Sequence, residues 1–225
     1  MDRLVFVAFG DSLTVGYHSA ISEGQWLRPT PYTRFLKEKA DNMLHQRDKV
    51  SLRVEFLNRG IIGELTRDMV DRFDHDVVVP QPKAVIILGG SNDLGWGIEP
   101  PSVANNLAEM ADEALEHGIQ PIACTVPSVL GFDEGIGPRL QLNQLIKAFS
   151  LERNIICIDL FSATADSSTG RLREEYSNDG LHLNPLGYEI MAEAIFSGAI
   201  SGIISKRLED VRLAGGQIQI GSNNT

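Results

Sequence analysis

Residues 4–16 read LVFVAFGDSLTVG, an apolar run that ends abruptly in a glycine, a carboxylate and a hydroxyl. The run Leu4–Phe9 has the length and the continuous apolar character of a strand that is covered on both faces in a parallel sheet. Gly10, Asp11 and Ser12 follow at the carboxyl end of that strand. In open α/β sheets this end is the edge at which ligands bind. The stretch therefore predicts a parallel α/β fold with a serine at its ligand-binding edge.

The rest of the chain alternates strand-like runs with helical patterns, which is the order that builds a parallel sheet with helices on both faces. The predicted strands are Leu4–Phe9, Leu52–Leu57, Ala84–Leu88, Pro121–Val126 and Ile155–Asp159. Apolar residues at helical spacing predict helices near Pro31–Gln46, Glu64–Phe73, Ser102–His117, Ile136–Arg153 and Pro185–Arg207. Three stretches without a regular pattern follow predicted strands and should form loops at the ligand edge: Tyr17–Thr30, Leu94–Pro101 and Pro127–Gly135.

The length of the chain fits one domain. A chain of 225 residues and 24.7 kDa can bury a sizeable core and lies near the upper range of a single α/β unit. We assign residues 1–212 to one domain. Residues 213–225 are polar and contain glycine, so we expect them to form a loosely attached tail.

Composition excludes several classes of partner. The formal net charge of −10 and the isoelectric point near 4.9 would repel a phosphate backbone, so we expect no nucleic acid partner. No apolar run approaches the roughly 18 residues that span a bilayer, so we expect no stable membrane insertion. Cys124 and Cys157 lie in strand-like runs, and we predict free buried thiols rather than a disulfide. This pattern favours a cytoplasmic location, with secretion left open and the oligomeric state unknown.

Ser12 becomes a useful nucleophile only if a base accepts its proton and a third group holds that base. Near the other end of the chain, the segment NDGLHLNPLGY places Asp179 and His182 three residues apart before the last predicted helix. A turn there would let the carboxylate hold one imidazole nitrogen while the other nitrogen faces Ser12. The plainer alternatives are that Asp11 and Ser12 form a turn and cap a helix, and that Asp179 is a cap beside an exposed histidine.

Attack on an ester also puts negative charge on oxygen, which fixed hydrogen-bond donors stabilise. The segment NRGIIGELT follows the second strand, and Gly63 in it would let a backbone N–H approach a ligand closely. The segment GGSND follows the third strand and offers the side-chain amide of Asn92. The main-chain N–H of Ser12 would be a further donor, although both glycine-rich segments are also compatible with ordinary turns. Sequence motifs for nucleotide or compact metal sites are missing, so we expect no cofactor and no metal.

These segments, taken together and in order, resemble the four blocks of the SGNH, or GDSL-type, esterase and lipase superfamily. The resemblance runs from residue 10 to residue 188. It implies Ser12 as nucleophile, Asp179 and His182 as its partners, and an oxyanion hole formed by Ser12, Gly63 and Asn92. It also implies a three-layer α/β/α sandwich of the flavodoxin-like kind with a central five-stranded parallel sheet, and metal-independent hydrolysis through an acyl-enzyme.

Two positions depart from the family pattern. Glu64 stands where many members have Asp, and Leu183 where many have Pro. Neither has a proposed catalytic role, so we interpret them as marks of a subgroup. Asp11 and Asp93 are expected to hold their turns through hydrogen bonds to the backbone.

The substrate is the least defined part of this interpretation. Trp26, Trp96 and Phe132 lie in the three loops and are candidates for lining an apolar pocket or stacking on a sugar, although each could equally anchor its loop. We expect a small soluble ester. The alternatives are a carbohydrate O-deacetylase, a lysophospholipase or thioesterase, and, outside the enzymes, an inactive binding module with the same fold.

Overall fold

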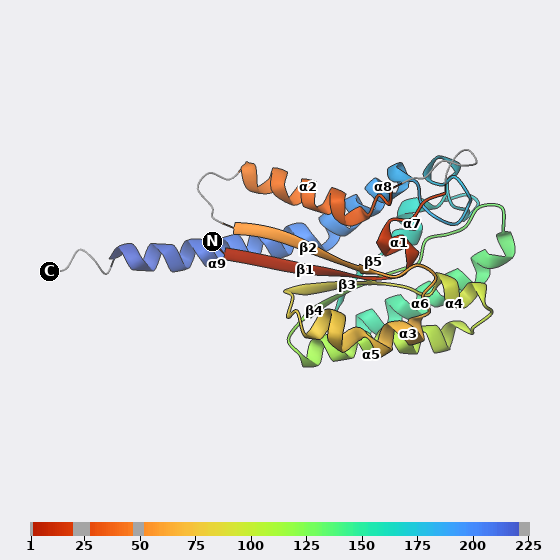
Figure 1. Ribbon diagram of the computed structural model, residues 1–225, viewed down its shortest axis with the longest axis horizontal. Helices are drawn as coiled ribbons and strands as arrows, with labels where there is room; N and C mark the ends of the chain where they lie inside the picture. Colours follow the sequence, from red (N-terminus) through yellow and green to blue (C-terminus); the bar gives the residue numbers. More distant parts are fainter. Residues whose placement is uncertain (1, 20–27, 47–51, 221–225) are drawn as a thin grey trace.

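The computed structural model describes residues 2–19, 28–46 and 52–220, with side chains to residue 213. Its centre is a sheet of five parallel strands in the order β2-β1-β3-β4-β5, with helices on both faces (Figure 1). This order is that of flavodoxin-like folds. The predicted α/β/α sandwich is therefore confirmed. The strands are β1 Asp2–Gly10, β2 Leu52–Gly60, β3 Ala84–Leu88, β4 Gln120–Cys124 and β5 Ile156–Ile158.

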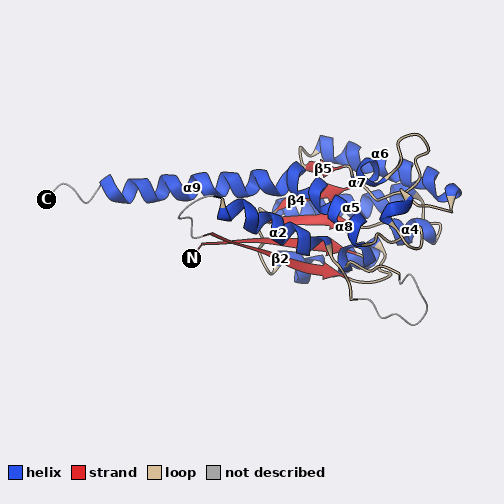
Figure 2. Ribbon diagram, turned by 90° about the horizontal axis from the view of Figure 1, so that it is seen from above, coloured by secondary structure: helices blue, strands red, loops and turns tan. Residues whose placement is uncertain are grey.

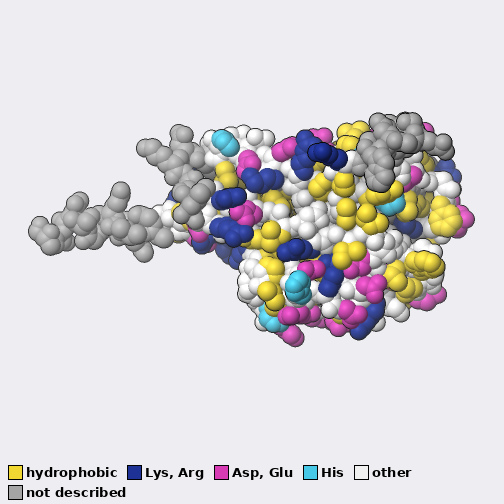
Figure 3. Space-filling model, in the orientation of Figure 1, with side chains coloured by type: hydrophobic (Ala, Val, Ile, Leu, Met, Phe, Trp, Pro, Cys, Tyr) yellow, Lys and Arg dark blue, Asp and Glu magenta, His cyan; other side chains and the backbone are white. Residues whose placement is uncertain are grey.

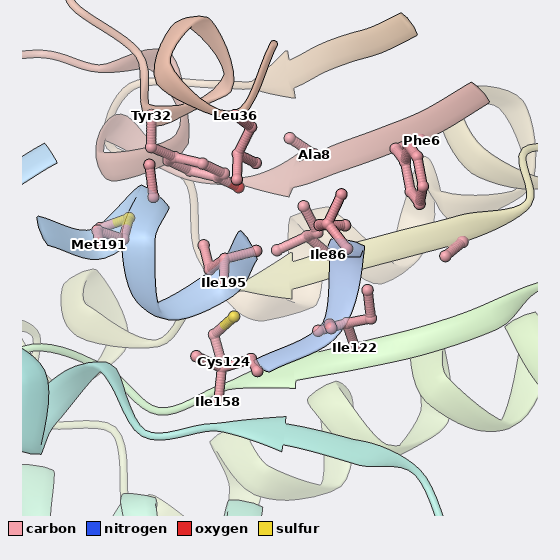
Figure 4. Packing of buried hydrophobic residues seen from close by; sticks show 14 of the residues in the cluster. Phe6, Ala8, Tyr32, Leu36, Ile86, Ile122, Cys124, Ile158, Met191 and Ile195 are labelled. Carbon is pink, nitrogen blue, oxygen red and sulfur yellow. The ribbon is translucent and has the colours of Figure 1, made fainter. Parts of the chain in front are cut away.

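The two faces of the sheet build two separate hydrophobic clusters. Because successive strand side chains point to opposite faces, Phe6 and Ala8 of β1 join one cluster while Val7 and Phe9 join the other. Figure 4 shows Phe6 and Ala8 in the same cluster as Ile86 of β3 and as Tyr32, which is fully buried. Helices α2 Tyr32–His45 and α8 Pro185–Ile195 cover this face, whereas α3 Thr66–Asp71, α5 Pro100–Glu116 and α6 Ile136–Glu152 cover the other.

Several boundaries differ from the sequence-based expectations. Helix α5 begins at Pro100 rather than Ser102, because proline is well suited to the first turn of a helix. The loop expected from Leu94 onward is shortened accordingly, and its start belongs to a short helix, α4 Ser91–Gly95. The remaining short elements are α1 Ser12–Val15, η1 Asp74–Val78, η2 Asp133–Gly135, α7 Leu160–Thr164 and η3 Glu174–Tyr176.

The last helical segment starts as predicted and ends later. The Asn184 side chain accepts a hydrogen bond from the Gly187 N–H at 3.1 Å, so Asn184 is the N-cap of α8. A π-helical turn, η4 Phe196–Ile200, joins α8 to α9 Ser201–Ile220. The tail expected from residue 213 is therefore helical up to Ile220, since an established helix propagates where no proline stops it. Figure 2 shows α9 projecting well beyond the sheet.

Strand order places the candidate site. Strand β1 pairs with β2 and β3, and Gly10 lies opposite Gly60 on one side and Leu88 on the other. Strand β2 is added on one side of β1 and the later strands on the other side, so the strand order reverses at β1. Open α/β sheets leave a crevice for ligands at such a point. The segments that follow β1, β2 and β3 therefore meet at one edge of the sheet.

Candidate active site

Ser12 stands at the start of the short helix α1, immediately beyond β1. The Asp11 carboxylate accepts a hydrogen bond from Leu13 N–H at 2.9 Å, and its backbone carbonyl accepts from Thr14 and Val15. Asp11 is thus the N-cap predicted from its side-chain chemistry. This tight turn leaves Ser12 largely buried, at the edge where β1 ends.

Gly10 makes the turn possible. A Cβ on Gly10 would lie 2.0 Å from the Leu88 carbonyl oxygen and 2.6 Å from Thr14 Oγ1, so no larger residue fits between β1 and β3. This close packing of Gly10 fixes the position of Ser12 relative to the end of β3.

His182 and Asp179 form the pair expected from their spacing. His182 Nδ1 and Asp179 Oδ2 are 2.9 Å apart, and Asp179 Oδ1 accepts from the backbone N–H of His182 at 2.7 Å and of Leu181 at 2.9 Å. Partial burial works to raise the pKa of Asp179, but hydrogen bonds from Ser19, His182 and the backbone outweigh it and hold that pKa well below its ordinary value. Asp179 is therefore a carboxylate that can orient the imidazole.

Tyr17 links this pair to the serine turn. Its backbone N–H donates to the Ser12 carbonyl at 3.0 Å, and its ring meets the His182 imidazole edge-on with centroids 4.6 Å apart. Tyr188 Oη, from α8, donates to the Tyr17 carbonyl at 2.6 Å. Among the described residues no hydrogen bond joins Ser12 Oγ to His182, and such bonds often tighten only with substrate present. The direct contact between them stays a prediction.

Two of the three candidate oxyanion donors, Gly63 and Asn92, lie in adjoining segments. Gly63 is exposed and has φ +76°, and no atom lies within 4 Å of the position of an added Cβ, so a ligand can approach its backbone. Asn92 Nδ2 donates to the Glu64 carbonyl at 2.9 Å, which fixes the Asn92 amide beside Gly63. An amide nitrogen carries two hydrogens, so the second remains available to a ligand.

The two aspartates next to these candidates hold the turns. Buried Asp93 accepts from the backbone N–H of Thr66 at 3.1 Å, a side-chain to backbone bond of the kind predicted, and from Thr66 Oγ1 at 2.6 Å, so it also ties α4 to α3. Burial, aided by the nearby charges of Asp93 and Glu64, raises the pKa of Asp11 to about 7 against the opposing effect of the Leu13 hydrogen bond. No catalytic role is assigned to either aspartate.

Glu64 does more than mark a subgroup. Its backbone carbonyl accepts from Asn92, and its buried carboxylate pairs with Arg72, whose Nε is 2.6 Å from Glu64 Oε1. Arg72 also donates to the Arg59 carbonyl at 3.0 Å and stacks 4.1 Å over the Phe9 ring. The residue after Gly63 is therefore anchored to β1, β2 and α3 together.

A cavity of about 460 Å³ opens beside Asn92 and Asp179. Two of the three predicted pocket aromatics, Trp96 and Phe132, line it, and both are exposed at its rim. The third, Trp26, lies outside the described residues. Figure 3 shows hydrophobic side chains gathered at this end of the molecule.

Residues that sequence reasoning missed also shape the site. Ser19 Oγ donates to Asp179 Oδ2 at 2.5 Å, and Asn178 Nδ2 donates to the Ser19 carbonyl at 2.8 Å, so the loop after α1 is joined to the His182 turn. Ser177 Oγ donates to the His182 carbonyl at 2.6 Å. Arg139 lines the cavity from α6. A lone serine in a loop, or an arginine in a helix, carries no local signal that would have singled it out.

Two further properties concern the described part of the chain. Cys124 and Cys157 are both free, as predicted, with Cys124 buried and Cys157 half-buried. Across residues 2–19, 28–46 and 52–220, no helix combines the length and apolarity needed to cross a bilayer, and no three potential metal-binding side chains of His, Cys, Asp or Glu gather together.

Known proteins match this chain along most of its length. The uncharacterized lipoprotein YqeF of Bacillus subtilis (strain 168) is 27% identical over an alignment that covers 86% of this chain and 88% of the relative. Among solved structures, the lipase/acylhydrolase from Enterococcus faecalis superposes with a TM-score of 0.68 at 25% identity, covering 87% of this chain and 93% of that one. A mutant of Axe2, an acetyl-xylooligosaccharide esterase from Geobacillus Stearmophilus, shares the fold with a TM-score of 0.71 at 21% identity, covering 88% and 93%.

The family model for GDSL-like lipases and acylhydrolases matches residues 8–190, from the end of β1 into α8. This span contains the serine turn, both candidate donor segments and the His182 turn. The chain belongs to the GDSL-like lipase/acylhydrolase family.

Proposed function

We propose that the protein is a serine esterase that cleaves small soluble carboxylic esters through an acyl-enzyme. Ser12 attacks the acyl carbon, His182 takes its proton, and Asp179 stabilises the imidazolium that forms. The observation that carries this proposal is the Asp179–His182 hydrogen bond, held against α1 by Tyr17. The family is one of ester-bond hydrolases, which supports the reaction class.

The oxyanion of the tetrahedral intermediate would lie among the N–H groups of Ser12 and Gly63 and the free amide hydrogen of Asn92. His182 then protonates the leaving alcohol. Water enters and attacks the acyl-enzyme with His182 again as base, which releases the acid and restores Ser12. All proton transfers in this scheme use one imidazole, so the reaction needs no metal, and we expect turnover to survive treatment with a chelator.

The test uses a fluorophosphonate probe, which labels activated serines, together with hydrolysis of p-nitrophenyl acetate. The wild type should be labelled, and Ser12→Ala and His182→Ala should lose labelling and turnover. Ser102→Ala, which changes an exposed hydroxyl on α5, is the matched control and should behave as wild type. Labelling of Ser12→Ala at the wild-type rate would overturn the nucleophile assignment. A folded wild type with neither labelling nor turnover would favour an inactive binding module.

One observation favours a carbohydrate O-deacetylase as second candidate. Trp96 is 79% exposed at the rim of the cavity, where its indole could stack on a sugar ring. Acetylated xylo-oligosaccharides compared with a p-nitrophenyl ester series of increasing chain length would separate the candidates. Preference for the acetylated sugar, lost in Trp96→Ala, would support the deacetylase, whereas a rise in kcat/KM with acyl length would support a lysophospholipase or thioesterase.

The compartment remains a prediction as well. The free thiols fit the cytoplasmic location expected from the sequence, while one relative bears the name lipoprotein. Fractionation of cells that make the protein would decide between them.

A further inference from the structure

Arg139 is a buried arginine without an ion-pair partner among the described residues. Only 4% of the residue is exposed, and its Nη1 donates to the Gly135 carbonyl at 3.1 Å, one turn earlier along the chain. Its Nε is buried and has no hydrogen-bond partner. A guanidinium stays charged in proteins, and a buried charge without a partner strongly destabilises the folded state. An anion bound beside Arg139 would therefore stabilise its buried charge.

Asp11 does not provide that partner. Its charge acts on Arg139 and works against the lowering of the Arg139 pKa by burial, but no hydrogen bond or ion pair joins the two in the described part of the chain. The Asp11 carboxyl is engaged with Leu13 N–H instead. Its own pKa is raised to about 7, so near neutral pH part of the population carries no charge there.

Arg139 instead lines the cavity that adjoins the reactive groups. The same cavity of about 460 Å³ is bounded by Asn92 and Asp179, and Trp96 and Phe132 form its apolar rim. A group bound at Arg139 would therefore belong to a molecule whose reacting carbonyl lies beside the candidate oxyanion donors.

The carboxylate that lines the cavity already has partners. Among the described residues that line the cavity, Asp179 is the one carboxylate, and it accepts hydrogen bonds from Ser19, His182 and Leu181. Asp133, next to the rim residue Phe132, is paired with Arg171. Among the described residues that line the cavity, Arg139 is thus the one cation, and it has free donor capacity.

We propose that Arg139 binds a carboxylate on the substrate, so that the enzyme selects esters that carry an acidic group on the part of the molecule that fills this cavity. The planar guanidinium presents paired N–H donors that match a carboxylate. A half-ester of a short dicarboxylic acid has the required chemistry, with one ester carbonyl at Ser12 and one free carboxylate at Arg139. This inference rests on the proposed esterase function and adds its substrate class.

The experiment compares monomethyl glutarate with methyl 5-methylhexanoate, in which an uncharged isopropyl group replaces the carboxylate, by following acid release. The wild type should have a kcat/KM for the charged ester at least tenfold above that for the neutral one. Arg139→Met should lower the ratio of the two kcat/KM values by tenfold or more, mainly through KM of the charged ester, and Arg139→Lys should retain part of it. Arg67→Met, an exposed arginine on α3, is the matched control and should leave the ratio as in wild type.

Two results would overturn the proposal: a wild type with no preference for the charged ester, or an Arg139→Met variant in which both esters lose activity by the same factor. If Arg139→Met does not fold, the ratio of the wild-type kcat/KM values for the charged and the neutral ester still tests the proposal. If a folded wild type hydrolyses neither ester, the esterase function fails separately. Calorimetric titration with glutarate then tests the site itself: binding that weakens at least tenfold in Arg139→Met supports it, and equal or absent binding refutes it.

Discussion

The side-chain amide of Asn92 donates a hydrogen bond to the backbone carbonyl of Glu64, the residue that follows Gly63. This bond crosses from the segment after β3 to the segment after β2. This bond uses one of the two amide hydrogens of Asn92 and fixes the plane of the amide group. The orientation of the second hydrogen, the one proposed to bind the oxyanion, is thereby fixed as well. Two of the three donors proposed for the oxyanion, Gly63 and Asn92, are therefore held beside each other.

Replacing Asn92 by Ala should lower kcat by about 100-fold to 1,000-fold, because one oxyanion donor is lost, with a much smaller change in KM. Steady-state kinetics on p-nitrophenyl acetate measure both constants. Asn105→Ala, on the exposed side of α5, should change neither. A rise in KM with an unchanged kcat would instead show that Asn92 binds the substrate in the ground state.

Ser19 should act as a positioning residue through Asp179. Ser19→Ala removes a hydrogen bond that stabilises the Asp179 carboxylate, so the pKa of Asp179 rises and the imidazole is held less firmly. We expect kcat to fall about tenfold and the acid-side loss of activity to move to higher pH. Ser19→Thr keeps the hydroxyl and should restore both. A fall in kcat with an unmoved pH profile would show that the serine only supports its loop.

Asp11 should make the protein less stable as pH rises. Its folded-state pKa of about 7 lies above the ordinary value of 3.8, so between these values the folded state holds a proton that the unfolded state has released. The free energy of unfolding of the wild type should therefore fall, relative to Asp11→Asn, by about 1.4 kcal/mol per pH unit in this window. Urea unfolding at pH 5 and pH 7 measures the difference.

The matched control for this pH effect is Asp68→Asn on the exposed side of α3. It should run parallel to wild type at both pH values. If Asp11→Asn did so too, the carboxyl of Asp11 would not be protonated in the folded protein.

Gly10 should tolerate no side chain. In Gly10→Ala the Cβ meets the Leu88 carbonyl at 2.0 Å, a backbone atom that cannot move without separating β1 from β3. We expect loss of cooperative unfolding, or of nucleophile labelling in any folded fraction. Gly137→Ala is the matched control in α6, where no atom lies within 4 Å of the new Cβ, and it should be neutral or stabilising by up to about 1 kcal/mol. Thermal unfolding of both variants gives the comparison.

Local sequence was sufficient for the fold and for the elements that carry the site. The apolar run before Gly10 and the alternation of strands and helices predicted the sheet, and Asn184 with Pro185 predicted the start of α8. The spacing of Asp179 and His182 predicted their contact. Each of these signals lies within a few neighbouring residues.

Features that depend on distant pairing escaped prediction. Ser19 meets Asp179 across 160 positions of the chain, and Arg139 reaches the cavity only because α6 packs against the same edge. Glu64 differs from its family counterpart by one methylene, and the reason becomes visible only with Arg72 beside it. No local rule contains such information.

The bond between Tyr188 Oη and the Tyr17 carbonyl spans 171 positions and joins α8 to the serine turn. Ser12 is therefore synthesised long before the imidazole of His182 and the carboxylate of Asp179. A chain that stops before Asp179 carries the nucleophile but no base to activate it. Activation of the serine thus waits for the segment that carries His182, and for α8 to dock against the serine turn.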